Sequence, residues 1–303
     1  MNEDGLWYLE KFTDNQIHSF KVKEIIFRGE TEYQKVDILN LEIFKKTLFL
    51  NQKIQSAEID EYIYHECLVF PALFSHPDVK AALILGGGEG ATLRETLKVK
   101  TIEYVDMVDI DRELVNLCKK YLPEWSDGAF DNPKAKIYYE DGKKFLENSK
   151  KKYDLIISDL SEPVQESPSL QLFTRETFKK IYDKLEEDGI FVLQSGSADP
   201  FYCKFFASII KTLKELFPVI RPYWTFISSF RVPWGFTIAS KIHDPLKLKE
   251  DELKESIEEK LIKKINFYSH TIHKSLFAIP GYLSKAVEST NIITETSPFI
   301  WEF

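Results

Sequence analysis

A glycine-rich turn at residues 86–90 is the strongest chemical signal in the sequence. Residues 83–85 read as a buried strand that breaks into Gly86-Gly87-Gly88-Glu89-Gly90. Glycines let the backbone turn tightly and approach a ligand closely, and the first amides of the helix that follows are free to donate hydrogen bonds. Gly86 and Gly88 are therefore predicted to bind a ligand. A tight strand-to-helix connection without a ligand is the alternative.

Acidic residues end the next two predicted strands. Asp109 lies about 20 residues beyond the last glycine, where a doubly wound fold places a carboxylate that accepts both ribose hydroxyls. The run Glu140-Asp141-Gly142 ends the following strand, in a position to contact the edge of an adenine. Because the ends of these strands converge on one crevice, the crevice is predicted to hold an adenosine.

The spacing of the glycines favours one class of adenosine ligand. Gly86, Gly88 and Gly90 read GxGxG, which is typical of folds that bind S-adenosylmethionine or its relatives, whereas a dinucleotide fingerprint reads GxGxxG. Glu89 would repel a pyrophosphate but suits the amino end of a cationic sulfonium ligand. We therefore predict a sulfonium nucleoside rather than NAD.

Two more carboxylates, Asp159 and Glu162, follow the fourth strand of this region. Both are expected at the mouth of the same crevice, where they would form an acidic pocket. An amine attacks carbon only through a free lone pair, so a protonated amine must first lose a proton. Asp159 is suited to hold the ammonium, accept its proton and orient the lone pair in line with the C–S bond. The alternative is an aspartate that caps the next turn.

The elements that must position these residues are predicted from Lys80 onward. Apolar strands at 81–85, 103–110, 136–139, 154–158 and 190–194 alternate with helices at 91–99, 112–121, 174–185 and about 201–217. Such strands, separated by helical crossovers, indicate a parallel sheet covered on both faces. The predicted fold class is α/β, a doubly wound Rossmann-like sheet of the kind found in S-adenosylmethionine-dependent methyltransferases.

A smaller domain is predicted before this sheet. Residues 7–50 contain short β-branched and aromatic runs between polar turns, which is typical of a small antiparallel sheet. Apolar residues recur at helical spacing from near Asp60, so a helix is expected to lead into the second domain. We divide the chain into an N-terminal β domain, residues 1–60, and a Rossmann-like catalytic domain, residues 61–303. Later segments at 223–230 and 234–239 read as strands, and 247–264 as a solvated helix.

Composition excludes several classes of protein. With 44% hydrophobic and 29% charged residues, the chain has the balance of a soluble globular protein with a sizeable core. The formal net charge of −8 argues against nucleic acid as a partner. No apolar run approaches the roughly 20 residues that cross a bilayer, so no membrane partner is expected and a cytoplasmic location is predicted.

Cysteines and histidines suggest no metal. The three cysteines form no CxxC pair and are expected to be reduced, mostly buried thiols. The histidines outside the motifs show no metal-ligand spacing and are assigned no chemistry: His18, His76, His243, His270 and His273. A metal site is therefore not predicted.

From about Tyr33 to Ala239, the sequence resembles the spermidine synthase family of polyamine aminopropyltransferases. The matching segments are Tyr33-Gln34, Leu50 through Ile54-Gln55 to Asp60-Glu61, Tyr64-His65-Glu66, the glycine run with Leu93-Arg94-Glu95, Asp109-Ile110-Asp111, Asp141-Gly142, the Asp159 loop and Leu193-Gln194. The resemblance implies transfer of an aminopropyl group from decarboxylated S-adenosylmethionine, a co-substrate, to a polyamine, with release of 5′-methylthioadenosine. It implies no prosthetic group, and a homodimer or homotetramer.

The resemblance also implies roles for the matched residues. The donor nucleoside would be bound by Gln34, Gln55, Asp109, Asp141 and Gly142, with Pro168 on the adenine side. Glu89 and Asp159 would face the aminopropyl group of the donor, and Asp159 would be the catalytic base. The acceptor groove would be lined by Tyr64, His65, Glu162 and Gln194.

Structural roles compete with several of these assignments. Gln34 and Gln55 could be exposed strand residues, Tyr64 and His65 could pack at the domain junction, and Gln194 could be a hydrogen-bonding residue at a strand end. Trp224, Phe230 and Trp234 either flank the methylenes of the acceptor or pack in the core.

Departures from the common family pattern concern the acceptor. Glu89 and Glu162 replace aspartates, the loop 163–174 differs from the usual form, and Ser228-Ser229-Phe230 with Trp234-Gly235 replaces a tyrosine-bearing segment. These variants look like the thermospermine synthase branch, whose acceptor is spermidine; putrescine and agmatine stay open as acceptors. Two other functions compete: a methyltransferase that uses intact S-adenosylmethionine, and a catalytically silent polyamine-binding paralogue.

Overall fold

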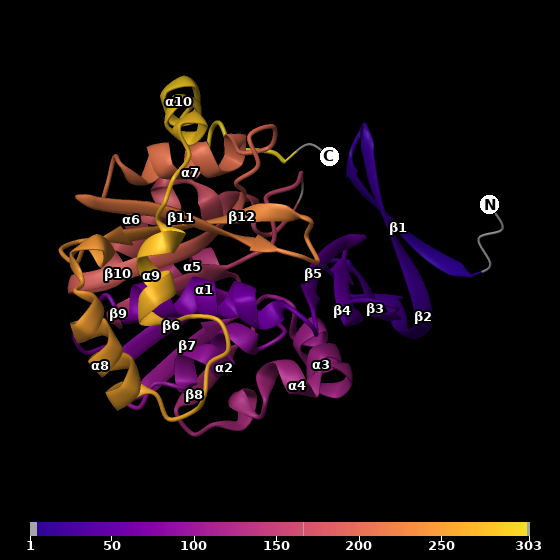
Figure 1. Cartoon of the computed structure of the whole chain (residues 1–303), viewed down its shortest axis with the longest axis horizontal. Coiled ribbons are helices and arrows are strands. Elements are labelled where there is room, and N and C mark those ends of the chain that lie inside the picture. Colours follow the sequence, from indigo (N-terminus) through magenta and orange to yellow (C-terminus); the bar gives the residue numbers. More distant parts are fainter. Residues whose placement is uncertain (1–4, 166, 302–303) are drawn as a thin grey trace.

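The structure is a computed structural model that describes residues 5–165 and 167–301. Three parts of the chain lie outside the described residues. They are residues 1–4 of the predicted N-terminal domain, and Glu166 in the loop 163–174 and residues 302–303 of the predicted catalytic domain. The described chain contains two sheets, one of five strands and one of seven. Figure 1 shows the five N-terminal strands (indigo) standing beside the larger sheet and its helices.

The N-terminal sheet is antiparallel throughout, as the sequence predicts. Its strands follow one another in order: β1 (Leu6–Thr13), β2 (Gln16–Glu30), β3 (Lys35–Leu41), β4 (Lys45–Leu50) and β5 (Lys53–Ala57). Apolar residues of β3 and β4, such as Val36, Ile38 and Leu48, are fully buried against residues of the second domain that include Leu114 and Trp125. This packing fixes one end of the small sheet against the larger domain.

The larger sheet has the order β11-β12-β10-β9-β6-β7-β8. Five neighbouring strands are parallel, as predicted: β10, β9, β6, β7 and β8. The other two strands are antiparallel, β12 to β10 and β11 to β12. The strands are β6 (Ala81–Gly86), β7 (Tyr104–Val108), β8 (Ala135–Tyr138), β9 (Tyr153–Asp159), β10 (Leu185–Ser197), β11 (Val219–Ile227) and β12 (Val232–Ser240). The fold is thus a parallel-dominated Rossmann-like sheet with an antiparallel hairpin at one edge.

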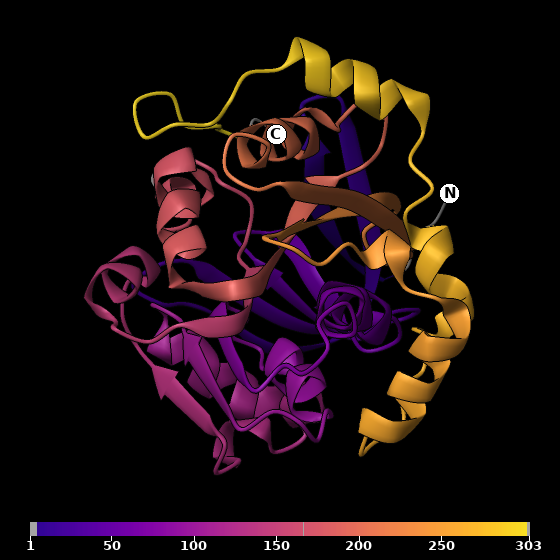
Figure 2. The same ribbon diagram turned by 90° about the vertical axis from the view of Figure 1, so that its left-hand side faces the viewer.

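Helices cover both faces of this sheet. They are α1 (Glu61–Leu73), α2 (Ala91–Leu97), α3 (Arg112–Tyr121), α4 (Pro123–Ser126), α5 (Gly142–Asn148), α6 (Arg175–Lys184), α7 (Lys204–Leu213), α8 (Glu250–Lys260), α9 (His270–Leu276) and α10 (Gly281–Ser289). The helix expected at about 201–217 is shorter, because residues 200–203 and 214–216 form turns at its two ends. Figure 2 shows the C-terminal segment with α8, α9 and α10 running along the outside of the domain.

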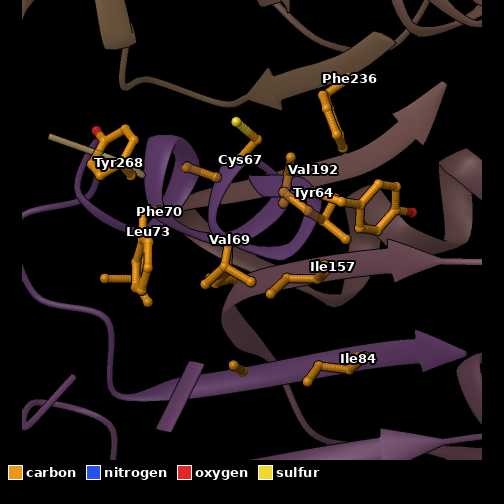
Figure 3. Close-up of a cluster of buried hydrophobic side chains, with 14 of the residues drawn as sticks. Tyr64, Cys67, Val69, Phe70, Leu73, Ile84, Ile157, Val192, Phe236 and Tyr268 are labelled. Carbon is orange, nitrogen blue, oxygen red and sulfur yellow. The ribbon is translucent and has the colours of Figure 1, made fainter. Parts of the chain in front are cut away.

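The helix α1 connects the two sheets and packs at the centre of the core. Figure 3 shows Val69 of α1 next to Ile84 and Ile157 of the parallel strands, and Tyr64 near Phe236 of β12. Every residue of β6 is buried, which explains its continuous apolar sequence. Among the described residues, no helix combines the length and the apolar character that crossing a membrane needs.

Candidate active site

A cavity of about 630 Å³ opens where the carboxyl ends of the parallel strands meet the N-terminal sheet. Ligand sites of small-molecule enzymes commonly have this size and this place in an α/β fold. The predicted site residues that line it are Gln34, Gln55, Tyr64, Gly86, Gly88, Glu89, Asp109, Asp141, Gly142, Asp159, Glu162, Pro168 and Gln194. Residues from both sheets and from the loop after β9 therefore surround one space.

The glycine turn is shaped by its contact with the end of β9. Gly86 has a φ of +84°, and a Cβ atom there would lie 2.3 Å from the backbone oxygen of Asp159. The amide of Gly87 donates a 2.9 Å hydrogen bond to the same oxygen. Only glycine fits this close approach, and the contact holds the ligand-facing turn against Asp159.

Asp109 lies across the turn from the glycines. A Cβ atom on Gly88 would come within 2.9 Å of Oδ2 of Asp109, so the missing side chain leaves this carboxylate accessible. The amide of Asp111 donates to Oδ1 of Asp109 at 2.8 Å. Burial raises the pKa of Asp109 to about 7, and the nearby carboxylate of Asp111 adds to the shift.

Asp111 connects this strand end to the N-terminal sheet. One oxygen accepts from the Leu114 amide and caps α3, while the other accepts from Nε2 of Gln34 at 2.9 Å and from the hydroxyl of Thr31. Gln34 is thus fixed by the second domain rather than being a free strand residue. Gln55 of β5 lines the same wall of the cavity.

Asp141, Gly142 and Pro168 border another part of the cavity. Asp141 caps α5 through a 2.9 Å hydrogen bond from the Lys144 amide, and Pro168 lies exposed on the loop after β9. Capping is thus one established task of Asp141. The three residues still border the cavity together, as expected for one side of an adenine pocket.

Both carboxylate oxygens of Asp159 are hydrogen-bonded. The phenol of Tyr64 donates to Oδ1 at 2.8 Å, and the hydroxyl of Thr92 donates to Oδ2 at 2.5 Å. Burial, followed by the charge of Glu89, raises the pKa of Asp159, and these two hydrogen bonds oppose the rise. Sequence reasoning missed Thr92; its place in the first turn after Gly90 was the available signal.

On the side away from the cavity, Glu89 contacts a buried series of charged side chains: His65, Glu61 and Arg94. Nε2 of His65 lies 3.0 Å from Glu89, and Nδ1 lies 2.9 Å from Glu61, which also accepts from Arg94 at 2.8 Å. Burial alone would lower the pKa of His65, but hydrogen bonds to the two glutamates raise it to about 10. His65 is therefore an imidazolium at neutral pH.

This arrangement corrects the expected place of His65 in the acceptor groove. Its ring is buried behind Glu89 and is not among the described residues that line the cavity. Burial would raise the pKa of Glu61, but His65 and Arg94 hold it near 2, so the chain of alternating charges is complete. The histidine contacts a site carboxylate rather than the cavity itself.

Aromatic rings line the far end of the cavity. The rings of Trp234 and Phe230 meet at 4.8 Å, and Phe230 contacts Tyr64 at 5.9 Å. They form a wall that leads to Asp159, with Glu162 also bordering the space; burial raises the pKa of Glu162 to about 7. This combination of apolar rings and carboxylates suits a chain of methylenes with charged nitrogens.

Gln194 and Lys53 also border this end of the cavity. Gln194 donates to the Leu160 carbonyl at 2.6 Å and accepts from the Gly196 amide, so its amide is engaged by backbone although it borders the cavity. Trp224 lies elsewhere: its indole donates to the Ala278 carbonyl, which supports packing rather than an acceptor contact. Lys53 of β5, which sequence reasoning missed, borders the cavity, and its Nζ donates to the Lys11 carbonyl. Burial lowers the pKa of Lys53 to about 8, against the opposing charges of Glu10 and Glu162.

Comparisons with known proteins agree with this geometry. The family model of the spermine/spermidine synthase domain matches residues 61–250, and that of the spermidine synthase tetramerisation domain matches residues 6–58. A polyamine aminopropyltransferase of Sulfurisphaera tokodaii is 38% identical over 288 residues, 95% of each chain. One of Saccharolobus solfataricus is 38% identical over 294 residues, covering 96% of this chain and 97% of the relative.

Solved structures give the same result. A spermidine synthase in complex with the transition-state analogue AdoDATO superposes with a TM-score of 0.88 at 30% identity, covering 95% of this chain and 97% of that chain. The spermidine synthase of Thermotoga maritima superposes with a TM-score of 0.86 at 32% identity, covering 95% and 96%. At this coverage the likeness extends over both sheets.

Proposed function

Because the chain belongs to the spermidine synthase family and is a polyamine aminopropyltransferase, we propose that it transfers the aminopropyl group of decarboxylated S-adenosylmethionine to spermidine. The product would be thermospermine or spermine, and 5′-methylthioadenosine would be released. The family membership argues against the alternatives of a methyltransferase and a silent paralogue. We also propose that the protein is cytoplasmic, as the sequence predicts.

The nucleoside of the donor would occupy the side of the cavity nearest the glycine turn. Asp109 would accept the ribose hydroxyls, with Gln34 and Gln55 on the N-terminal wall. Asp141, Gly142 and Pro168 would surround the adenine. The room that Gly88 leaves in front of Asp109 supports this placement, because a larger residue would fill the space beside the carboxylate.

The single observation that carries the proposed chemistry is the double hydrogen bond that fixes Asp159 beside the glycine turn. Glu89 and Asp159 would attract the aminopropyl ammonium of the donor, but they offer nothing to the carboxylate of intact S-adenosylmethionine. This charge arrangement supports the decarboxylated donor. No step of the proposed reaction uses a prosthetic group.

The reaction would proceed by a direct displacement. Asp159 takes a proton from the acceptor ammonium, directly or through water, and the freed lone pair attacks the propyl carbon bound to sulfur. The C–N bond forms as the C–S bond breaks, and the electron pair of that bond returns to sulfur, which becomes the neutral thioether of methylthioadenosine. Tyr64 and Thr92 fix the direction in which Asp159 accepts the proton.

The acceptor would lie along the aromatic wall. The rings of Tyr64, Phe230 and Trp234 would contact its methylenes, and Glu162 would bind a second nitrogen. Spermidine is favoured over putrescine by the features that resemble the thermospermine synthase branch, namely Glu162, the segment 228–230 and Trp234. The amide of Ser229 donates to buried Asp60 at 2.7 Å, which holds this segment at the start of α1.

One assay tests the acceptor. Putrescine, spermidine and agmatine are supplied separately with decarboxylated S-adenosylmethionine, and products are separated by chromatography against thermospermine and spermine standards. We expect the highest kcat/KM with spermidine. A clear preference for putrescine or agmatine would overturn the acceptor while leaving aminopropyl transfer intact.

We also propose that the chain forms a homo-oligomer through its first hairpin. On the outward face of β1 and β2, Leu9 is 58% exposed and Ile17 is 63% exposed. The residues on the other face of the same hairpin, Tyr8, Glu10, His18 and Phe20, are buried. Apolar residues exposed on a sheet face are typical of subunit contacts. Light scattering on the Leu9→Glu/Ile17→Glu variant tests this: a homodimer or homotetramer should shift toward the monomer, and an unchanged mass would exclude this face.

A further inference from the structure

Two histidines and an aspartate far apart in the sequence meet at the end of the large sheet where its parallel strands begin, opposite the cavity. His76 follows the end of α1, Asp188 lies near the amino end of β10, and His243 follows β12. Gln194, which borders the active site, is at the carboxyl end of β10, so the cluster is separated from it by the length of that strand. A metal site was not expected here from the sequence, because the three residues have no ligand spacing along the chain.

The distances within the cluster fit a shared ion better than direct hydrogen bonds. Oδ2 of Asp188 lies 3.4 Å from Nε2 of His76 and 3.6 Å from Nε2 of His243. Charge-assisted hydrogen bonds are shorter, about 2.7–2.9 Å. Ligand atoms about 2.0–2.2 Å from a tetrahedral ion, in contrast, lie about 3.3–3.6 Å from one another.

The histidine nitrogens are the second observation. Both Nε2 atoms are shielded from solvent, and neither has a hydrogen-bond partner within residues 5–165 and 167–301. His76 is only 5% exposed. A buried ring nitrogen without a partner is costly, so a missing ligand is a physical explanation for the arrangement.

A simple ion pair explains the cluster less well. In an ion pair the charged groups would approach more closely, whereas the nearest oxygen of Asp188 is 3.4 Å from Nε2 of His76 and 3.6 Å from Nε2 of His243. A neutral imidazole is the form that ligates metals. Nδ1 of His76 accepts from the amide of exposed Asp78 at 3.1 Å, and ion binding at Nε2 would move the ring proton to Nδ1 and break this contact.

The other cluster of this kind provides a contrast. His65, Glu89 and Asp159 also bring three ligand atoms together, but both ring nitrogens of His65 are within 3.0 Å of a glutamate oxygen. That histidine is engaged on both sides and carries a proton on each nitrogen. His76 and His243 differ from His65 because their Nε2 atoms have no hydrogen-bond partner among the described residues.

We propose that His76, Asp188 and His243 form a site for a divalent transition-metal ion such as Zn²⁺. The mixed imidazole and carboxylate set is typical for Zn²⁺, Co²⁺ and Ni²⁺. Asp188 is 43% exposed, so the ion has access from solvent and water completes its coordination. The ion joins the end of α1 to β10 and β12, and its role is structural because the cavity lies at the other edge.

Zinc titration after dialysis against a chelator tests the site. Isothermal calorimetry of the full chain should give one Zn²⁺ per chain, and saturating Zn²⁺ should raise Tm by about 3 °C or more. Co²⁺ should give the visible absorption of a site with imidazole ligands. Asp188→Asn and His243→Gln should each weaken binding at least about 10-fold and remove the Tm shift.

Two control variants make the result specific. His270→Gln changes a half-buried histidine outside the cluster, 4.0 Å from Glu250, and should bind Zn²⁺ like the parent chain. Glu89→Gln removes a possible ligand in the active site and should also retain binding. Absence of binding in the parent chain, undiminished binding in Asp188→Asn and His243→Gln, or loss of binding only in Glu89→Gln would each overturn the proposal.

Discussion

The phenol of Tyr64 donates a 2.8 Å hydrogen bond to Oδ1 of Asp159, and so joins the first turn of α1 to the end of β9. Because Thr92 donates to the other oxygen, the carboxylate has a fixed orientation at the floor of the cavity. The two bonds favour the ionised carboxylate, whereas burial and Glu89 favour the protonated one. The balance between them sets the pH range in which Asp159 accepts a proton.

Replacing Tyr64 with phenylalanine should shift the pH profile of the enzyme. The lost hydrogen bond raises the pKa of Asp159 further, so the acid limb of kcat/KM should move to higher pH and kcat near pH 7 should fall about 10-fold. Steady-state assays between pH 5.5 and 9 measure both effects. Tyr223→Phe is the matched control, since it removes a buried tyrosine hydrogen bond to the Cys67 carbonyl; an equal shift in both variants would contradict the assignment.

Asp109 should make nucleoside binding depend on pH. Its pKa is raised to about 7 by burial, and ribose hydroxyls donate to the ionised form, so affinity for methylthioadenosine should decrease as the pH falls below about 7. Asp109→Asn should weaken binding about 10–100-fold near pH 8 and abolish this dependence. Calorimetry at several pH values checks both. Asp106→Asn, on the same strand but bonded to Tyr153, should keep the pH dependence.

His65 should contribute to stability in a defined pH range. Its pKa is about 10 in the folded chain and 6.5 as the ordinary value, so its contribution is complete below about pH 6.5 and is lost as the pH rises through 10. His65→Gln should cost about 3–5 kcal/mol at pH 7, since it leaves Glu89 without the imidazolium and Glu61 with Arg94 as its remaining cation. The difference should shrink toward pH 10, by at most about 1.4 kcal/mol per pH unit.

Urea unfolding at a series of pH values measures this difference. His273→Gln is a suitable control, because burial lowers the pKa of His273 and its ring stays neutral above pH 7. The cost of that variant should be flat between pH 7 and 10. A flat cost for His65→Gln as well would show that His65 is not an imidazolium.

Lys53 should influence the choice of acceptor. It supplies a positive charge at the end of the cavity that Glu162 borders, and acceptors with more ammonium groups suffer more repulsion from it. Lys53→Met should therefore raise the ratio of kcat/KM for spermidine to that for putrescine, by about 3–10-fold given solvent screening. Lys11→Met, a nearby exposed lysine paired with Asp14, should leave the ratio unchanged.

Many of the residues that line the cavity could be predicted from the sequence, for a topological reason. In a parallel sheet, all carboxyl strand ends reach one edge, so recognising the strands before Gly86, Asp109 and Asp159 was enough to bring these residues together. The antiparallel direction of β12 was not predicted, because an apolar strand reads alike in either direction. The long hairpin of β1 and β2 was missed in part, because Leu9 and Ile17 on its outer face and the buried Glu10 and His18 on its inner face obscure the alternation of apolar and polar residues.

The hydrogen-bond and ion-pair networks between side chains could not be predicted from the sequence. The pairing of His65 with Glu61 and Glu89 depends on the angle at which α1 crosses the glycine turn, which no spacing reveals. The cluster of His76, Asp188 and His243 unites loops that only the complete sheet brings together. Residues that the backbone brings to the cavity could therefore be predicted, and contacts that depend on tertiary partners could not.

The most direct test of the account is the Asp159→Asn variant, assayed with decarboxylated S-adenosylmethionine and spermidine, together with calorimetry of methylthioadenosine binding. The amide keeps the shape of the side chain but has no oxygen basic enough to take the ammonium proton. We predict that turnover falls about 10²–10⁴-fold while affinity for methylthioadenosine changes less than about 3-fold. Turnover close to that of the parent chain would contradict the assignment of Asp159 as the base.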